Sequence, residues 1–128
     1  MTMAGRRPLC IVIRIPDAAL SREELEAALG GPLSRHEPSR DGTSAYAQID
    51  IADDPDEWTA AIDCVQSVGD ALRKLSVDGR IGSPILDVAV TFPSSLAATS
   101  LKIPAGLAAA AGQAGIGIEV SIYCTSDE

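Results

Sequence analysis

The sequence predicts an α+β fold, in which a single sheet carries helices on one of its faces. Several segments alternate between apolar and polar residues, which is the pattern of strands with one solvent-facing side. Segments with helical spacing or helix boundary signals lie between these strands. With 128 residues, the chain has the length of one domain, spanning residues 1–128. A sheet with helices on one face accounts for all three observations.

The first strand is expected over residues 9–15, where both faces are largely apolar and predict a central place in the sheet. A helix should follow from Ser21, which is a suitable N-cap, and Glu24 completes a capping box with it. Gly30 ends this helix, because glycine adopts the left-handed conformation that closes helices. Residues 31–43 are polar and contain proline and glycine, which predicts an irregular loop.

A second strand is expected over residues 44–52 and has one polar face. The long helix after it should begin with Asp54 as its N-cap and Pro55 in the first turn. Apolar residues at helical spacing continue this helix to about Val77. A third strand is expected over residues 84–92.

The C-terminal part predicts a β-α-β unit. Residues 99–103 are compatible with a short strand, an alanine-rich helix begins at Pro104, and the last strand follows Gly115. The beginning of the chain has the same order, because residues 13–16 (IRIP) precede the first helix as residues 101–104 (LKIP) precede the last.

Two β-α-β units predict a ferredoxin-like split β-α-β sandwich, with four to five mostly antiparallel strands. The helices would lie on one face, and the long helix would be an addition between the two units. A parallel four-stranded α/β sheet is the alternative, since a helix can follow every strand. In the ferredoxin-like order, the first and last strands are antiparallel neighbours. The pairs expected across them are Arg14 with Glu119, Val12 with Ser121, and Cys10 with Tyr123.

Charge and composition restrict the partners of this protein. The net charge of −8 disfavours nucleic acid and anionic membranes, since both repel an acidic surface. A basic protein partner would be attracted. No segment approaches the roughly 20 apolar residues of a membrane span. The three cysteines are widely spaced, which is typical of reduced thiols and predicts a cytoplasmic protein.

The outward positions of the predicted strands gather polar side chains on the open face of the sheet. Three carboxylates among them, Asp50, Asp87 and Glu119, could bind a hard cation or act as an acid/base pair if two converge. The simpler interpretation is a solvated face with an Arg14–Glu119 ion pair, because alternation places polar residues there in any case. We assign no catalytic residue, no metal ligand and no cofactor. The candidate binding residues are Arg14, Tyr46, Gln48, Asp50, Asp87, Glu119 and Tyr123, with Ser121 beside them.

A second candidate lies in the expected loop 31–43, which contains His36, the only histidine. Arg35, His36 and Arg40 would form a small anion-binding patch there, and a plain solvated loop is the alternative. A serine–histidine–aspartate triad is disfavoured, because its members would share one flexible loop without a nucleophile elbow.

Motifs at both ends of the chain resemble a known family. They are Ile13-Arg14-Ile15, the helix start Ser21-Arg22-Glu23-Glu24-Leu25 with its end Leu29-Gly30, Ser100-Leu101-Lys102-Ile103-Pro104, Gly115-Ile116 and Val120-Ser121-Ile122-Tyr123. Over most of its length the chain resembles the bacterial family known as domain of unknown function 4279, and residues 31–43 match it poorly. That family has no settled activity, so the resemblance implies no catalytic or ligand residue. It implies an uncharacterised bacterial protein and mildly favours a toxin-neutralising immunity protein.

The leading functional hypothesis is a non-enzymatic protein-binding module, with immunity-type neutralisation of a protein partner as its most specific form. It is based on the acidic charge and the lack of a chemical motif. The first alternative is an enzyme that binds a small molecule or a metal through Asp50, Asp87 and Glu119. The second is a structural homodimer that buries Tyr46 and Tyr123 by face or edge pairing.

Overall fold

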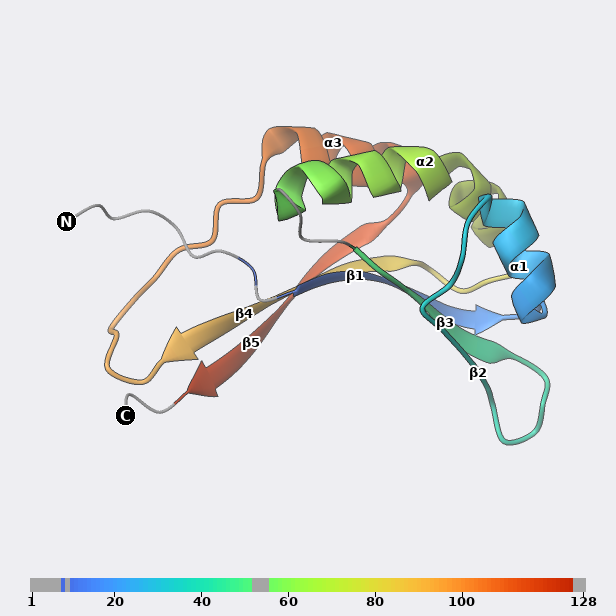
Figure 1. The fold of residues 1–128 in the computed structure, drawn as a ribbon, viewed down its shortest axis with the longest axis horizontal. Coiled ribbons are helices and arrows are strands. Elements are labelled where there is room, and N and C mark those ends of the chain that lie inside the picture. Colours follow the sequence, from blue (N-terminus) through green and yellow to red (C-terminus); the bar gives the residue numbers. More distant parts are fainter. Residues whose placement is uncertain (1–7, 9, 52–55, 126–128) are drawn as a thin grey trace.

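In the described part of the chain, five strands form one mixed sheet and three helices cover it (Figure 1). The computed structural model describes residues 8, 10–51 and 56–125. The elements in chain order are β1 (Cys10–Ala18), α1 (Arg22–Leu29), β2 (Arg35–Pro38), β3 (Ala45–Asp50), α2 (Glu57–Val77), β4 (Ile85–Pro93), α3 (Ala105–Ala114) and β5 (Gly117–Thr125). The strand order is β2-β3-β1-β4-β5. The predicted α+β class is confirmed.

β1 lies at the centre of the sheet, as its two apolar faces predicted. It pairs antiparallel with β3 on one side and with β4 on the other, and β2 extends the sheet antiparallel beyond β3. β5 pairs parallel with β4, because α3 carries the chain back along the sheet between them. The alternative of a wholly parallel sheet is therefore wrong.

The predicted pairing of the first and last strands is also wrong, because β4 lies between β1 and β5. Arg14 is opposite Gln48 and Ile85, whereas Glu119 lies beside Asp87. The expected pairs of Val12 with Ser121 and of Cys10 with Tyr123 are wrong for the same reason. Alternation fixes the face that a side chain occupies, but it does not identify the neighbouring strand. The ferredoxin-like sandwich depended on this pairing and is not confirmed.

Two stretches differ from their expected local structure. Part of the expected loop forms β2, which begins where the Ser34 amide donates to the Gln48 carbonyl (2.8 Å) and ends with Pro38 opposite Ala45. The sequence does not predict β2, because an edge strand that is largely exposed on both faces shows no apolar alternation. Conversely, residues 94–104 connect β4 to α3 without a regular strand, so the short strand expected within them is wrong.

The first helix starts as its boundary signals predict. Glu24 donates its amide to the Ser21 hydroxyl (3.1 Å), and the Glu24 carboxylate accepts from the Ser21 amide (2.9 Å). This confirms the capping box. Asp56 caps α2, whereas the predicted cap Asp54 and the following Pro55 lie outside the described residues.

The core lies between the sheet and the layer of α2 and α3 (Figure 1). Glycine and alanine let these two helices approach closely, since a Cβ added to Gly69 would lie only 2.9 Å from Cβ of Ala114. The largest fully buried side chains of the strands and helices are Ile11, Ile13, Ile15, Leu25, Val65, Leu72, Leu86, Val88 and Leu107.

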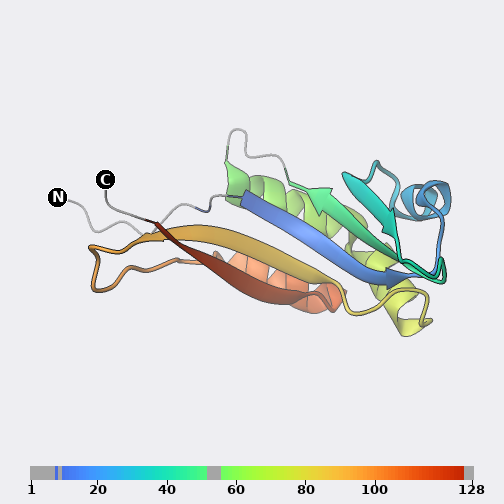
Figure 2. The same cartoon turned by 90° about the horizontal axis from the view of Figure 1, so that it is seen from below.

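The other face of the sheet is open in the described part of the chain. Figure 2 looks onto this face, and its strands lie in front of the helices. β4 and β5 also extend together beyond the helical layer, as Figure 1 shows. The open face of the sheet and the edge strand β5 are therefore the surfaces that are accessible to a ligand or partner.

Candidate functional site

A chain of hydrogen bonds crosses the open face from β5 to β3. Alternation along β1, β3 and β4 points its members away from the helices, as the sequence predicted. The described members in spatial order are Ser121, Asp87, Arg14, Tyr46, Gln48 and Asp50.

The centre of this chain is an ion pair between Arg14 and Asp87. Oδ2 of Asp87 accepts from Nε of Arg14 at 2.9 Å and lies 2.8 Å from its Nη2. Oδ1 accepts from the Ser121 hydroxyl at 2.7 Å, so both carboxylate oxygens are engaged. Asp87 is only 3% exposed. Its hydrogen bond raises the pKa of Arg14 above the ordinary value, so this guanidinium stays charged.

The chain continues in one direction from Arg14 to β3. Nη1 of Arg14 donates to the Tyr46 hydroxyl (2.7 Å), which donates to Oε1 of Gln48 (2.6 Å). Nε2 of Gln48 then donates to Asp50 (2.6 Å). Across the described residues, every buried side-chain nitrogen and oxygen has a hydrogen-bond partner. These six side chains thus form one continuous network, in which Arg14 pairs with Asp87 instead of with the expected partner Glu119.

The three candidate carboxylates lie in one line across the sheet. Val12 of β1 is opposite both Asp50 and Asp87, and Glu119 is beside Asp87 on the far strand. Neighbouring strands are about 4.8 Å apart, so the backbones at Asp50 and Asp87 are separated by roughly 10 Å. Within the described chain, no group of three His, Cys, Asp or Glu residues could hold a metal ion. With Asp87 engaged by Arg14, this line provides no free acid/base pair.

The second candidate, the basic patch around His36, does not come together. Arg35 and His36 are consecutive residues of β2, so their side chains point to opposite faces. Nε2 of His36 donates to the Leu20 carbonyl (2.9 Å), which gives it a structural role. Arg35 lies near Glu37 (3.7 Å), and Arg40 is in the exposed turn after the strand. The proposed anion site is therefore not supported by the geometry.

The three cysteines are free and lie apart. Cys10 and Cys124 are exposed on strands, and Cys64 is partly buried in α2. Burial raises the pKa of the Cys64 thiol, which keeps it protonated and poorly nucleophilic at neutral pH.

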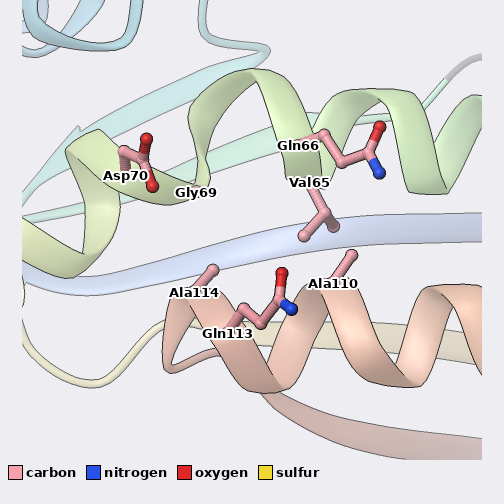
Figure 3. A pocket seen from close by; sticks show the side chains of 7 residues that line it. All are labelled: Val65, Gln66, Gly69, Asp70, Ala110, Gln113 and Ala114. Carbon is pink, nitrogen blue, oxygen red and sulfur yellow. The ribbon is translucent and has the colours of Figure 1, made fainter.

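A small hollow lies between α2 and α3 and has a volume of about 130 Å³ (Figure 3). Gly69 and Ala114 form its floor, where the helices touch. The polar side chains of Gln66, Asp70 and Gln113 lie around it, as Figure 3 shows. We interpret it as a surface groove between two closely packed helices with small residues at their contact. The polar side chains that line it are exposed, and none of them is buried.

The feature that the sequence did not identify is the apolar surface of β5. Four of the six exposed large apolar side chains of the described chain lie on this strand: Ile118 (37%), Val120 (40%), Ile122 (62%) and Tyr123 (52%). The alternation of β5 places the isoleucines and the valine on the helix-facing side of the sheet, where strand residues are ordinarily buried. They are in register with buried Leu86, Val88 and Val90 of β4, but they are not covered.

The composition of α3 explains this exposure. Leu107 is its only large apolar residue, and this side chain is fully buried. A helix of alanine and glycine does not present enough side-chain surface to cover two neighbouring strands. The contrast between an alanine-rich α3 and an isoleucine-rich β5 is the signal from which the exposed edge could have been predicted.

Comparison with known proteins found no match of this chain to a protein-family model, to a curated protein or to a solved structure. Nothing in it tests the resemblance to domain of unknown function 4279. None of the described helices is both long and apolar enough to cross a membrane.

Proposed function

We propose that this chain is a non-enzymatic protein-binding module whose binding element is the outer edge of β5. The observation that carries this proposal is the row of Ile118, Val120 and Ile122, which are between 37% and 62% exposed on one strand. On soluble proteins, a contiguous exposed apolar patch of a few hundred Å² is often an interaction site.

The backbone of β5 supports strand addition at this edge. The Gly117 amide donates to the Pro84 carbonyl, and the Thr125 carbonyl accepts from the Ser94 amide, so both ends of β5 bond towards β4. In a parallel ladder these residues alternate with residues whose amide and carbonyl point the other way. Residues 118, 120, 122 and 124 therefore present their backbone groups outwards, where no described strand pairs with them. An extended segment can bind there through main-chain hydrogen bonds.

The open face supports the non-enzymatic part of the proposal. Asp87 is held by Arg14 and Ser121, and Val12 lies between it and Asp50. An acid/base pair or a cation site needs carboxylates that are free and close together. This observation favours a binding module over an enzyme that uses Asp50, Asp87 and Glu119.

The more specific form is immunity-type neutralisation of a basic protein partner in a bacterial cytoplasm. The net charge of −8 supports a basic partner, because opposite charges accelerate association. The free cysteines are compatible with a reducing compartment. Binding to such a partner should weaken as salt screens the attraction.

Affinity purification with an edge variant tests the proposal. Tagged wild-type protein is used at low salt to recover partners from a lysate of the organism that encodes it, and each partner is then purified and recombined with the protein. Ile122→Lys places a charge in the exposed apolar row of β5. The control, Val77→Lys, places a charge on α2, at a residue that is 79% exposed and lies outside this row. We expect binding to be lost with Ile122→Lys and kept with Val77→Lys. A partner that binds both variants equally, or the recovery of neither another protein nor a second copy of this chain, would overturn the proposal.

A further inference from the structure

We propose that the occupant of the β5 edge is a second copy of this chain, whose own β5 pairs antiparallel with it about a twofold axis. The two five-stranded sheets would then join into one continuous sheet. This inference rests on the proposed function, because it assigns a partner to the same edge, and it places the second copy there instead of the basic protein of the more specific form.

The outward backbone groups of β5 match a second β5. Residues that face each other in an antiparallel pair alternate between bonded pairs, which exchange both backbone groups, and non-bonded pairs. One register pairs all nine residues of Gly117–Thr125 and places Ser121 opposite Ser121 of the other copy. In this register Ile118 is bonded to Cys124, and Val120 is bonded to Ile122. These are the residues whose backbone points outwards, so every outward group of the strand finds a partner.

The side chains also fit in this register. On the helix-side face, Val120 lies opposite Ile122 and Ile118 opposite Cys124, so the two exposed rows merge into one apolar band. On the open face, Glu119 lies opposite Tyr123 of the other copy. Glu119 is the only charged residue of the strand. A register with Glu119 opposite itself would place like charges directly across the pair, which destabilises a sheet.

The exposed area sets an upper limit on what these residues add to the dimer. Complete burial of the exposed surface of Ile118, Val120, Ile122 and Tyr123 would contribute roughly 400 Å², about half of the ~800 Å² that each partner buries in a standard interface. Backbone and polar atoms of the strand supply further area. We therefore expect an association that depends on protein concentration in the accessible range.

Charge distinguishes a second copy from a basic partner. Each copy carries a net charge of −8, so two copies repel one another at long range. Salt screens this repulsion, and the dimer should therefore become tighter as ionic strength rises. Binding of a basic protein would change in the opposite direction.

Sedimentation equilibrium of the purified protein over a concentration and salt series tests the dimer. We expect the mass of the wild type and of Val77→Lys to rise with concentration towards twice the monomer mass, and Ile122→Lys to keep the monomer mass throughout. Ile122→Thr, which keeps strand propensity but removes apolar surface, should raise the dissociation constant about tenfold or more. Far-UV circular dichroism and thermal unfolding verify that each variant is folded.

A single-cysteine variant tests the register. Ser121→Cys in a Cys10→Ser, Cys64→Ala, Cys124→Ser background places two thiols across the twofold axis, in a non-bonded pair with Cα atoms about 4.5 Å apart, where a disulfide can form. The control is Cys10→Ser with Cys64→Ala, which keeps Cys124. In the proposed register, the two Cys124 residues lie roughly 20 Å apart along the strands. Mild oxidation should give a covalent dimer for the first variant only.

Each outcome decides between the proposals. A monomer at all concentrations, or a dimer that Ile122→Lys does not affect, would overturn the inference. If such a monomer still binds another protein through β5, the proposed function stands with a different partner. If it binds nothing through β5, both fail. A covalent dimer of the control that keeps Cys124, without one of the Ser121→Cys variant, would refute the register.

Discussion

Replacing Gly69 with alanine should destabilise the protein, because α2 and α3 touch at this position. The added Cβ would lie 2.9 Å from Cβ of Ala114, well inside the ~3.5–4.0 Å of a favourable carbon–carbon contact. Alanine stabilises a helix interior over glycine by about 1 kcal/mol. Overpacking opposes this gain and costs about 1–3 kcal/mol. We therefore expect the free energy of unfolding to fall by about 0–2 kcal/mol.

The same substitution at Gly112 of α3 separates the two effects. Outside its own helix turn, no heavy atom of the described residues lies within 4 Å of a Cβ placed there, so Gly112→Ala keeps the helix gain of up to about 1 kcal/mol. The free energies of unfolding of the two variants should differ by about 1–3 kcal/mol. Urea denaturation at one fixed protein concentration measures this difference. Equal stabilisation by both substitutions would refute the close contact between the helices.

Three further predictions concern the ion pair, acid stability and the first helix. Asp87→Asn should lower the free energy of unfolding by about 1–3 kcal/mol in urea denaturation, because Arg14 loses its charged partner. The hydrogen bond from Ser39, together with those from Thr43, lowers the pKa of Asp41 from 3.8 to about 2. Its contribution to stability is therefore complete above pH 3.8 and is lost as the pH falls towards 2. Asp41→Asn should flatten this part of the pH profile of thermal unfolding, and an unchanged profile would contradict the assignment. Ser21→Ala removes the capping box and should cost about 1 kcal/mol in urea denaturation.

Conservative variants serve as controls for two of these predictions. Ser121→Ala removes a single hydrogen bond to Asp87 and should cost about 1 kcal/mol, so a loss as large as that of Asp87→Asn would argue against the ion pair as the main interaction. Ser21→Asp keeps an N-cap acceptor and should retain most of the stability. If Ser21→Asp were as unstable as Ser21→Ala, the cap would not be the cause.

Local sequence signals predicted most elements of the fold. The capping box of Ser21 and Glu24 formed as expected, and Ile11, Ile13 and Ile15 are buried against the helices. These features depend on residues close in sequence or on a period of two, which a single sequence contains. β2 was not predicted because its residues, three polar ones and a proline, show no apolar alternation. It is defined by its pairing with β3, which its own sequence does not indicate.

The sequence predicted part of the candidate site, because the period of two along a strand also determines which residues share a face. Arg14, Tyr46, Gln48 and Asp50 do share the open face with Asp87, because alternation fixes the face of each strand residue. The arginine's partner could not be derived, since it depends on which strand lies beside β1. That choice is made by packing across the whole sheet, where α3 returns the chain next to β4.

The two edges of the sheet differ, and this difference sets how far assembly can proceed. β2 has four residues, carries Arg35 and Glu37, and ends in Pro38, which lacks an amide donor. Short, charged and proline-containing edges resist the addition of further strands. A sheet with two apolar edges would add copies without limit and grow into fibrils. In the proposed dimer, β5 joins β5 and only the protected β2 edges remain at the ends, so growth would be self-limiting.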